Sequence, residues 1–272
     1  AKLAAARNLT LQDLQIFANN LLAQTDPVML AHGNLTEAAA LNLAKRVEAQ
    51  VLAGGGRADV ARAGIRQLPE GQTDAGLEID HPDTGYTLYL QGENTGYEER
   101  ARYRLLAQII GSPFYEEIRT SRQLGYIVYA TNFEILETPA LALVVQSPAA
   151  SSETIDQAVT EFANAYADEL AEISDSRLDR EKQAVISRLL ENERQLGEIS
   201  SRYWQEIDRE NHDFDSRERL ADAIRKVSLE KLQNTFEKAL LERENALLVS
   251  TSEQLPDSDQ VLEQLRRQPT VN

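Results

Sequence analysis

The most informative stretch of this sequence is SPFYEEIRTSRQLGYIVY, residues 112–129. Ser112 suits a helix N-cap and Pro113 suits the first helical turn, where no backbone N–H bond is lost, so we expect a short helix to begin here. From Gln123 to Asn132 the chain is rich in β-branched and aromatic residues, which is typical of a strand. The stretch therefore predicts a short helix followed at once by a strand.

Helical and strand patterns alternate on both sides of this stretch. Three further strands are expected after residue 77, at Tyr86 to Gln91, Leu141 to Gln146 and Asn245 to Thr251. Apolar residues at three- and four-residue steps predict helices between them. The expected helices are Tyr97 to Ile110, Ser152 to Ile173, Ser176 to Leu190, Gln195 to Ile207 and Leu229 to Leu240. Helices between antiparallel strands predict the α+β class, as a two-layer α/β sandwich with an antiparallel-rich sheet covered by helices.

The first 76 residues do not continue the alternation of helices and strands that is expected after residue 77. Helices are expected from Thr10 to Leu22 and after a Thr36 cap, with a buried strand over Pro27 to Asn34. The triple glycine at 54–56 lacks the Lys-Ser/Thr of a P-loop, so a flexible connector is the better interpretation. We therefore predict a partial domain over 1–54, a linker over 55–76, a complete domain over 77–253 and a loosely held polar tail over 254–272.

Composition excludes several classes of protein. The 272 residues carry a net charge of −16, which opposes the phosphate backbone, so no nucleic-acid partner is expected. The longest apolar run, Ala140 to Val145, is far shorter than the ~20 residues of a membrane span. With no cysteine, disulfides and thiolate ligands are excluded. Because residue 1 is Ala and no apolar leader follows, the chain is expected to be a processed or excised fragment.

Local chemistry alone reveals no active site. His32, His81 and His212 are the only histidines and no two share a helix face, so we expect no metal site. No Gly-x-Ser-x-Gly elbow occurs. Carboxylates such as Glu116 and Glu117 are better explained as part of a solvated helix face.

Residues 112–129 nevertheless resemble the carboxy-terminal signature of the pitrilysin and insulin-degrading enzyme (M16) family of zinc peptidases. The core of this signature is Leu/Ile-Arg-Thr, two residues, then Gln-Leu-Gly-Tyr. Other segments are similar to family elements in the same order, over at least Leu11 to Ser250. They are LAHGNLT at 30–36, IDHPD at 79–83, LYLQ at 88–91, RYWQEI at 202–207 and DFD at 213–215.

The resemblance implies a fold, a parent protein and a cofactor. The fold is the M16 (LuxS/MPP-like metallohydrolase) type, with the end of the third domain at 1–54 and the fourth domain at 77–253. The parent is a four-domain zinc metalloendopeptidase whose halves close like a clamshell around a peptide substrate. Zinc belongs to a His-x-x-Glu-His helix in the amino-terminal half, so this fragment is expected to bind no metal and to be inactive alone.

Carried over by motif position, the family's transition-state and substrate-binding residues are Arg119 and Tyr126. A preplaced guanidinium or neutral phenol can stabilise the negative charge that develops on a peptide carbonyl oxygen. The structural alternatives are a strand tyrosine packed between layers and a helix-end arginine that binds carbonyls. Arg122 and Gln123 are expected to hold the turn, and Gly125 to permit close backbone approach.

A second hypothesis stays open, that of a non-catalytic interaction or scaffold subunit of the same superfamily. The sequence names neither the substrate nor the oligomeric state. On the family resemblance, the expected compartment is the periplasm, with the cytoplasm as the alternative.

Overall fold

The computed structural model describes residues 2–51, 58, 60–252 and 254–271. Its contacts divide the chain into two compact units. The smaller unit combines Ala1–Ala63 with Glu193–Phe214, and the larger unit combines Gly64–Asn192 with Asp215–Asn272. The triple glycine at 54–56, which we interpreted as a connector, lies outside the described residues.

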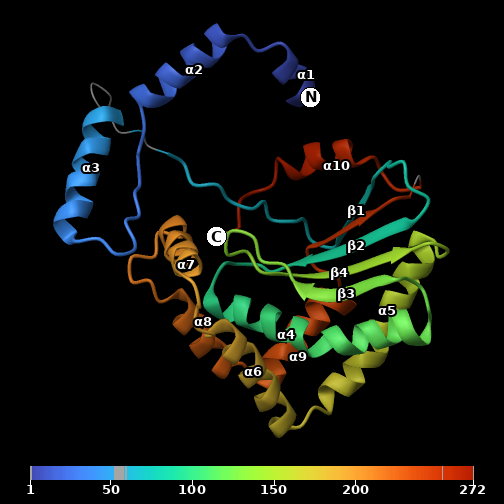
Figure 1. The fold of residues 1–272 in the computed structure, drawn as a ribbon. Helices are drawn as coiled ribbons and strands as arrows, with labels where there is room; N and C mark the ends of the chain where they lie inside the picture. The colour runs from blue at the N-terminus through green and yellow to red at the C-terminus, as the bar shows by residue number, and fades with distance from the viewer. Residues whose placement is uncertain (1, 52–57, 59, 253, 272) are drawn as a thin grey trace. The chain divides into compact units, whose positions relative to one another are not determined.

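The larger unit is built on a five-stranded sheet with strand order β1-β5-β2-β4-β3 (Figure 1). Strand β1 lies parallel to β5, and every other neighbouring pair is antiparallel. The antiparallel-rich sheet expected from the sequence is therefore confirmed. The strands are β1 (Gln72–Gly76), β2 (Thr84–Gln91), β3 (Ile127–Asn132), β4 (Ala140–Ser147) and β5 (Ala246–Ser250).

Helices cover one face of this sheet (Figure 1). They are α4 (Tyr97–Tyr115), α5 (Ser152–Ala171), α6 (Asp175–Leu189), α8 (Ser216–Arg225) and α9 (Leu229–Phe236). Two of them continue into short π-helices, α4 into η1 (Glu116–Ser121) and α9 into η2 (Glu237–Leu241). The predicted two-layer α/β sandwich is thus confirmed.

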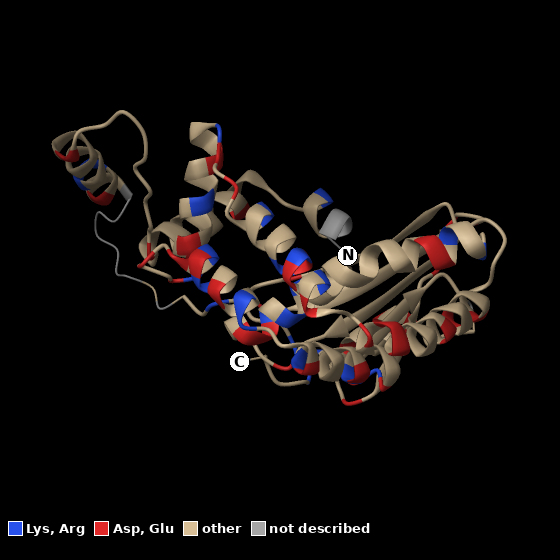
Figure 2. Cartoon of the chain, turned by 90° about the horizontal axis from the view of Figure 1, so that it is seen from below, with Lys and Arg blue, Asp and Glu red and all other residues tan. Residues whose placement is uncertain are grey.

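The core lies between the two layers. Because side chains alternate along a strand, Leu88 of β2 and Leu143 of β4 both point to the helical side, where they are buried. Leu105 of α4 and Phe162 of α5 meet them in the same cluster. The opposite sheet face carries exposed aromatic side chains, and in Figure 2 the charged residues are concentrated on the helices rather than on the strands.

The smaller unit is helical, with α1 (Lys2–Arg7), α2 (Leu11–Ala23), α3 (Glu37–Val51) and α7 (Leu196–Asp208). Thr10 and Asp13 form a reciprocal capping box at the start of α2. Thr36 accepts a hydrogen bond from the Ala39 N–H at 3.2 Å, as expected of a cap. None of the helices in the described residues is both long and apolar enough to span a membrane.

The strand predicted over residues 27–34 is wrong, because residues 27–32 have no regular secondary structure and residues 33–34 form a bend. A strand is stabilised by hydrogen bonds to a neighbouring strand, and all five named strands belong to the larger unit.

The prediction of a loosely held tail past Gln254 is also wrong. Asp257 caps a helix, α10 (Ser258–Leu265), which lies beside β1. Farther on, the Gln67 N–H donates to the Pro269 carbonyl at 2.8 Å and the Val271 N–H donates to the Ile65 carbonyl at 2.8 Å. Backbone hydrogen bonds therefore join the tail to part of the predicted linker. The signal was weak because this end of the chain is mostly polar and buries few apolar side chains, Val261 and Val271 among them.

Strand β1 and helix α8 were missed for similar reasons. β1 reads QTDAG, which contains only one β-branched residue, and it is stabilised by parallel pairing with β5. Half of the α8 residues are charged, and its buried face contains only two large apolar side chains, Leu220 and Ile224. Residues 72–76 thus belong to the sheet rather than to the predicted linker, while the other predicted domain boundaries stay predictions.

Candidate functional site

The corner between α4 and β3 carries the residues singled out from the sequence. The predicted helix start at Ser112 is wrong, because α4 runs through Pro113 and continues into η1. A proline inside a helix leaves the carbonyl four residues earlier without its N–H partner. Here that carbonyl is Ile109 O, and the Tyr166 hydroxyl from α5 lies 3.5 Å from it. Packing against α5 therefore compensates for the lost backbone bond.

A tight turn ends η1 and directs the chain into the sheet. The Arg122 N–H donates to the Glu117 carbonyl and the Leu124 N–H donates to the Ile118 carbonyl, each at 3.0 Å. Between them Gln123 adopts a left-handed φ of 56°. These wide backbone bonds close the helix end, as in other left-handed C-caps.

Gly125 is required where the turn meets β4. A Cβ at this position would lie 2.7 Å from the Gln146 carbonyl oxygen and 2.9 Å from a Val145 methyl carbon. The close backbone approach expected of Gly125 is confirmed. The next residue, Tyr126, then donates its N–H to the same Gln146 carbonyl at 3.1 Å.

Arg119 is held in place from two sides. Its Nη1 donates to the Gly125 carbonyl at 2.9 Å, and its Nε donates to the Tyr115 hydroxyl at 2.9 Å. The side chain is half-buried, and the guanidinium has five N–H donors. Among the described residues only these two hydrogen bonds engage it, so it can still donate to a ligand.

Tyr126 is about half exposed, and its hydroxyl donates to Asp83 Oδ2 at 2.7 Å. Gln146 Nε2 donates to the same carboxylate oxygen at 3.1 Å. The hydrogen bond to Asp83 raises the pKa of the Tyr126 phenol above its ordinary value of 10.0. At neutral pH the phenol is therefore protonated and a hydrogen-bond donor.

Arg119 and Tyr126 line the same open pocket, with a volume of about 460 Å³. Neither side chain is sealed between the layers. The pocket can therefore receive an anionic or strongly polarised oxygen between a cation and a neutral donor. Its other lining residues are Thr120, Gln123, Gly125 and Pro148.

Arg122 is not among the residues that line this pocket. It forms ion pairs with Glu117 of η1 and Glu161 of α5, which tie the turn to the helical layer. The prediction that Arg122 holds the turn is confirmed, whereas Gln123 both forms the turn and lines the pocket.

Sequence reasoning missed Asp83 and Gln146 as partners of Tyr126. Asp83 precedes β2, and Gln146 lies near the end of β4. The β2–β4 pairing brings these two strand ends together, with Gly85 opposite Gln146. An aspartate 43 residues from the tyrosine gives no local signal, so a strand-pairing prediction would have been needed to find it.

The histidines lie in separate settings. His32 in the smaller unit contacts the Ser200 hydroxyl at 2.8 Å, and its ring meets the Tyr203 ring edge-on. His81 Nδ1 accepts the Asp83 N–H at 3.1 Å. Over the described part of the chain, no group of three His, Cys, Asp or Glu side chains could hold a metal ion.

Comparison with known proteins gives matches over most of the chain. Residues 105–204 match the family described as PQQ synthase PqqF-like, C-terminal lobe domain 4. Protease 3 of Escherichia coli K12 is 27% identical over 251 residues, covering 89% of this chain and 25% of that protein. Human insulin-degrading enzyme is 26% identical over 226 residues, covering 78% of this chain and 21% of the enzyme. These matches support a likeness to the carboxy-terminal region of M16, pitrilysin-like peptidases.

Solved structures show the same fold. The crystal structure of pitrilysin matches with a TM-score of 0.77 and 24% identity, over 87% of this chain and 27% of pitrilysin. A peptidase M16 inactive domain from Pseudomonas fluorescens matches with a TM-score of 0.61 and 18% identity, over 92% of this chain and 59% of that one. The chain spans about a quarter of the length of the curated relatives, which are peptidases.

Proposed function

We propose that this chain is the zinc-free carboxy-terminal part of a zinc metalloendopeptidase that encloses peptides in a clamshell chamber. In this proposal Arg119 and Tyr126 bind the substrate and stabilise the transition state. The observation that carries the proposal is the convergence of both side chains on one open pocket. Their settings differ from those of buried structural residues, because water and a ligand can reach both.

The chemistry follows from the two donors. When water attacks a peptide carbonyl, negative charge develops on the carbonyl oxygen. A fixed guanidinium and a neutral phenol aimed at that oxygen lower the barrier, and removing one such donor typically costs ~10²–10³ in turnover. The raised pKa of Tyr126 keeps this donor protonated at neutral pH.

The Tyr126 hydroxyl has a single proton, which it donates to Asp83 in the structure. To serve the substrate, this proton has to turn from Asp83 to the carbonyl oxygen. The Asp83 carboxylate keeps the Gln146 amide as a partner when this happens. The change therefore leaves no carboxylate unpaired.

The described residues do not fit a zinc site, since the pocket presents donors rather than lone-pair ligands. We propose that zinc is held by an amino-terminal half, where it would supply the activated water. That half and the peptide substrate are the proposed partners. The chain alone is expected to be inactive.

Complementation tests the proposal. The chain is mixed with a zinc-bearing amino-terminal half, and cleavage of a quenched fluorescent peptide is followed. We expect cleavage only from the mixture, with a loss of about tenfold or more for Arg119→Met. Equal cleavage by the half alone would contradict a contribution from this chain.

The competing function is that of a non-catalytic interaction or scaffold subunit. The absence of a three-ligand group over the described residues fits either function. The sequence encoded upstream of Ala1 distinguishes them. A His-x-x-Glu-His helix in the same polypeptide supports the enzyme, and a complete parent without one supports the scaffold.

The proposed compartment is the periplasm, on family grounds alone. Cell fractionation of the tagged parent protein tests this, and recovery with cytoplasmic markers would contradict it.

A further inference from the structure

Strand β3 leaves one edge of the sheet unpaired within the described chain. It is the last strand in the order β1-β5-β2-β4-β3, so only β4 pairs with it. The Phe133 N–H donates to the Ala140 carbonyl at 2.8 Å, which fixes the hydrogen-bonding phase of the pair. In antiparallel pairing the phase alternates, so Val128, Ala130 and Asn132 direct their backbone N–H and C=O groups away from β4. An exposed row of this kind is a template for another extended chain.

A groove of about 680 Å³ runs beside this unpaired edge, and we name it the edge groove. Its walls are β3 on one side and α6, with Val185 and Leu189, on the other. Its floor is α4, where the small residues Ala107 and Gly111 face the opening. A Cβ on Gly111 would lie 3.7 Å from the Ala130 carbonyl oxygen, so the floor and the strand edge are close.

The polar groups of the edge groove suit an amide backbone. Asn132 Oδ1, an acceptor, and Arg104 Nε, a donor, are buried atoms without a hydrogen-bond partner among the described residues. Both side chains line the groove. A peptide amide offers the complementary pair, an N–H and a C=O. Arg188 adds a second cation to the lining, which favours neutral or acidic peptides.

We propose that the edge groove binds an extended stretch of the peptide substrate as an added strand on β3. This inference rests on the proposed function for the source of the peptide. The geometry selects an extended backbone, because a helix satisfies its own N–H and C=O groups and cannot pair with a strand edge. β3 begins directly after Tyr126, so one continuous segment carries both the docking edge and the candidate catalytic residue.

Hydrogen exchange of the chain, read residue by residue by NMR, tests the pairing without any catalysis. The probe is the capped peptide acetyl-Glu-Val-Thr-Val-Thr-Glu-amide. We expect the peptide to slow exchange of the Val128, Ala130 and Asn132 amides by about tenfold or more, since only these acquire partners. The amides of Tyr129 and Thr131 already face β4 and should not change. Protection confined to other surfaces would overturn the proposal. So would protection of the three amides that appears without peptide and increases with protein concentration, because the edge would then pair with a second copy of the chain.

Two matched pairs sharpen this test. Gly111→Leu fills the floor and should weaken peptide binding about tenfold or more. Gly197→Leu is the control, because it is also a helical glycine but has nothing within 4 Å of an added Cβ. Two isomers of the probe carry N-methyl groups on the backbone amides of one strand edge or of the other. Only one of these edges can pair with β3, so the affinities of the two isomers should differ by a similar factor. This comparison does not depend on whether Gly111→Leu folds. Equal binding of the isomers would overturn the proposal.

These results are separable from those for the proposed function. If Tyr126→Phe loses turnover but the peptide does not protect β3, the proposed function stands and peptide binding in the edge groove is overturned. If the peptide protects β3 but Tyr126→Phe keeps its turnover, peptide binding in the edge groove stands and the proposed role of Tyr126 is overturned.

Discussion

The larger unit contains two helix-to-strand corners in which the helix ends in the same kind of turn. In the first, α4 passes through η1 to β3, and in the second, α9 passes through η2 to β5. The Glu242 N–H donates to the Glu237 carbonyl and the Glu244 N–H donates to the Lys238 carbonyl. These bonds repeat the spacing found at Arg122 and Leu124 in the first corner, and Arg243, like Gln123, has a left-handed φ.

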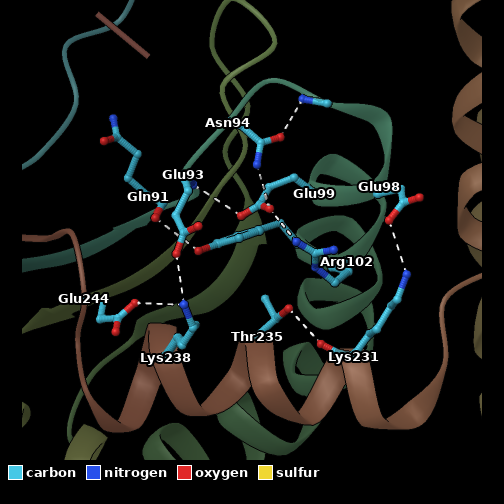
Figure 3. A network of polar contacts seen from close by, with 12 residues as sticks. Gln91, Glu93, Asn94, Glu98, Glu99, Arg102, Lys231, Thr235, Lys238 and Glu244 are labelled. Atoms are coloured by element: carbon cyan, nitrogen blue, oxygen red, sulfur yellow. Dashed lines mark hydrogen bonds and ion pairs between the residues drawn. The ribbon is translucent and has the colours of Figure 1, made fainter. Parts of the chain in front are cut away.

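The side chains at the two corners have opposite settings. At the second corner Arg243 binds Asp156, Gln72 and Thr160. Figure 3 shows Lys238 of η2 between Glu93 and Glu244. The first corner leaves Tyr126 about half exposed and part of the Arg119 guanidinium available. The same turn at the helix end thus lies beside a closed ion-pair network in one corner and beside an open pocket in the other, and the two corners differ in their side chains.

Arg243→Met should have the largest effect on stability. It leaves Asp156 without its cation and removes further bonds from a side chain that is only 14% exposed. We expect a loss of about 2–4 kcal/mol in the free energy of unfolding, measured by urea denaturation. Arg119→Met at the first corner is the matched variant, and it should cost only about 1 kcal/mol because water can solvate the freed Gly125 carbonyl. Equal losses would contradict the distinction between a structural and a functional corner.

Gly125→Ala should come next. The added methyl meets the Gln146 carbonyl, which is backbone and cannot move aside cheaply. A loss of about 2 kcal/mol is expected from such overpacking. Gly197→Ala, where an added Cβ meets nothing, serves as the control and should be neutral or slightly stabilising. A stable Gly125→Ala variant would show that the first corner is looser than the structure indicates.

Gln123→Gly should have a small effect of opposite sign. Its left-handed φ of 56° is unfavourable for a residue with a Cβ, and its side chain is exposed. Relief of this strain, less the entropy that glycine adds to the unfolded chain, should stabilise the protein by about 0.5 kcal/mol. The midpoint of urea unfolding should rise, and a fall would mean that the Gln123 side chain supports the turn.

The pKa of Tyr126 gives a test without any change in fold. NMR titration of ring-labelled tyrosine should show its pKa above 10.0, and Asp83→Asn should lower it. The pKa of Tyr126 is higher in the folded protein than in the unfolded chain. The protonated phenol therefore stabilises the fold fully below the unfolded-state pKa, and this stabilisation is lost as the pH rises through the folded-state pKa. The same Tyr126 pKa in both proteins would exclude Asp83 as the cause.

Sequence patterns were reliable where the physical signal is local. The period of apolar residues predicted α5 nearly to its ends, and the alternation in β2 predicted that strand. Pro113 misled us, because its ordinary place is a helix start and only packing against Tyr166 shows why it is tolerated inside α4. β1 could not be predicted, since its stability comes from pairing with a strand about 170 residues later.

The candidate site divides in the same way. Arg119 and Tyr126 came from a motif within one segment, and the structure brings both to one pocket. Asp83 and Gln146 join them only through the pairing of β2 with β4. No pattern in the sequence around either residue carries that information.

The most direct test is the turnover of Tyr126→Phe in the peptidase that we propose, assembled with its amino-terminal half, with Tyr129→Phe as the matched control. Both tyrosines are about half exposed and lie three positions apart, but only Tyr126 lines the pocket. The account predicts that Tyr126→Phe lowers kcat ~10²-fold, while Tyr129→Phe and the thermal stability of both variants stay close to wild type. Unchanged turnover in Tyr126→Phe would contradict it.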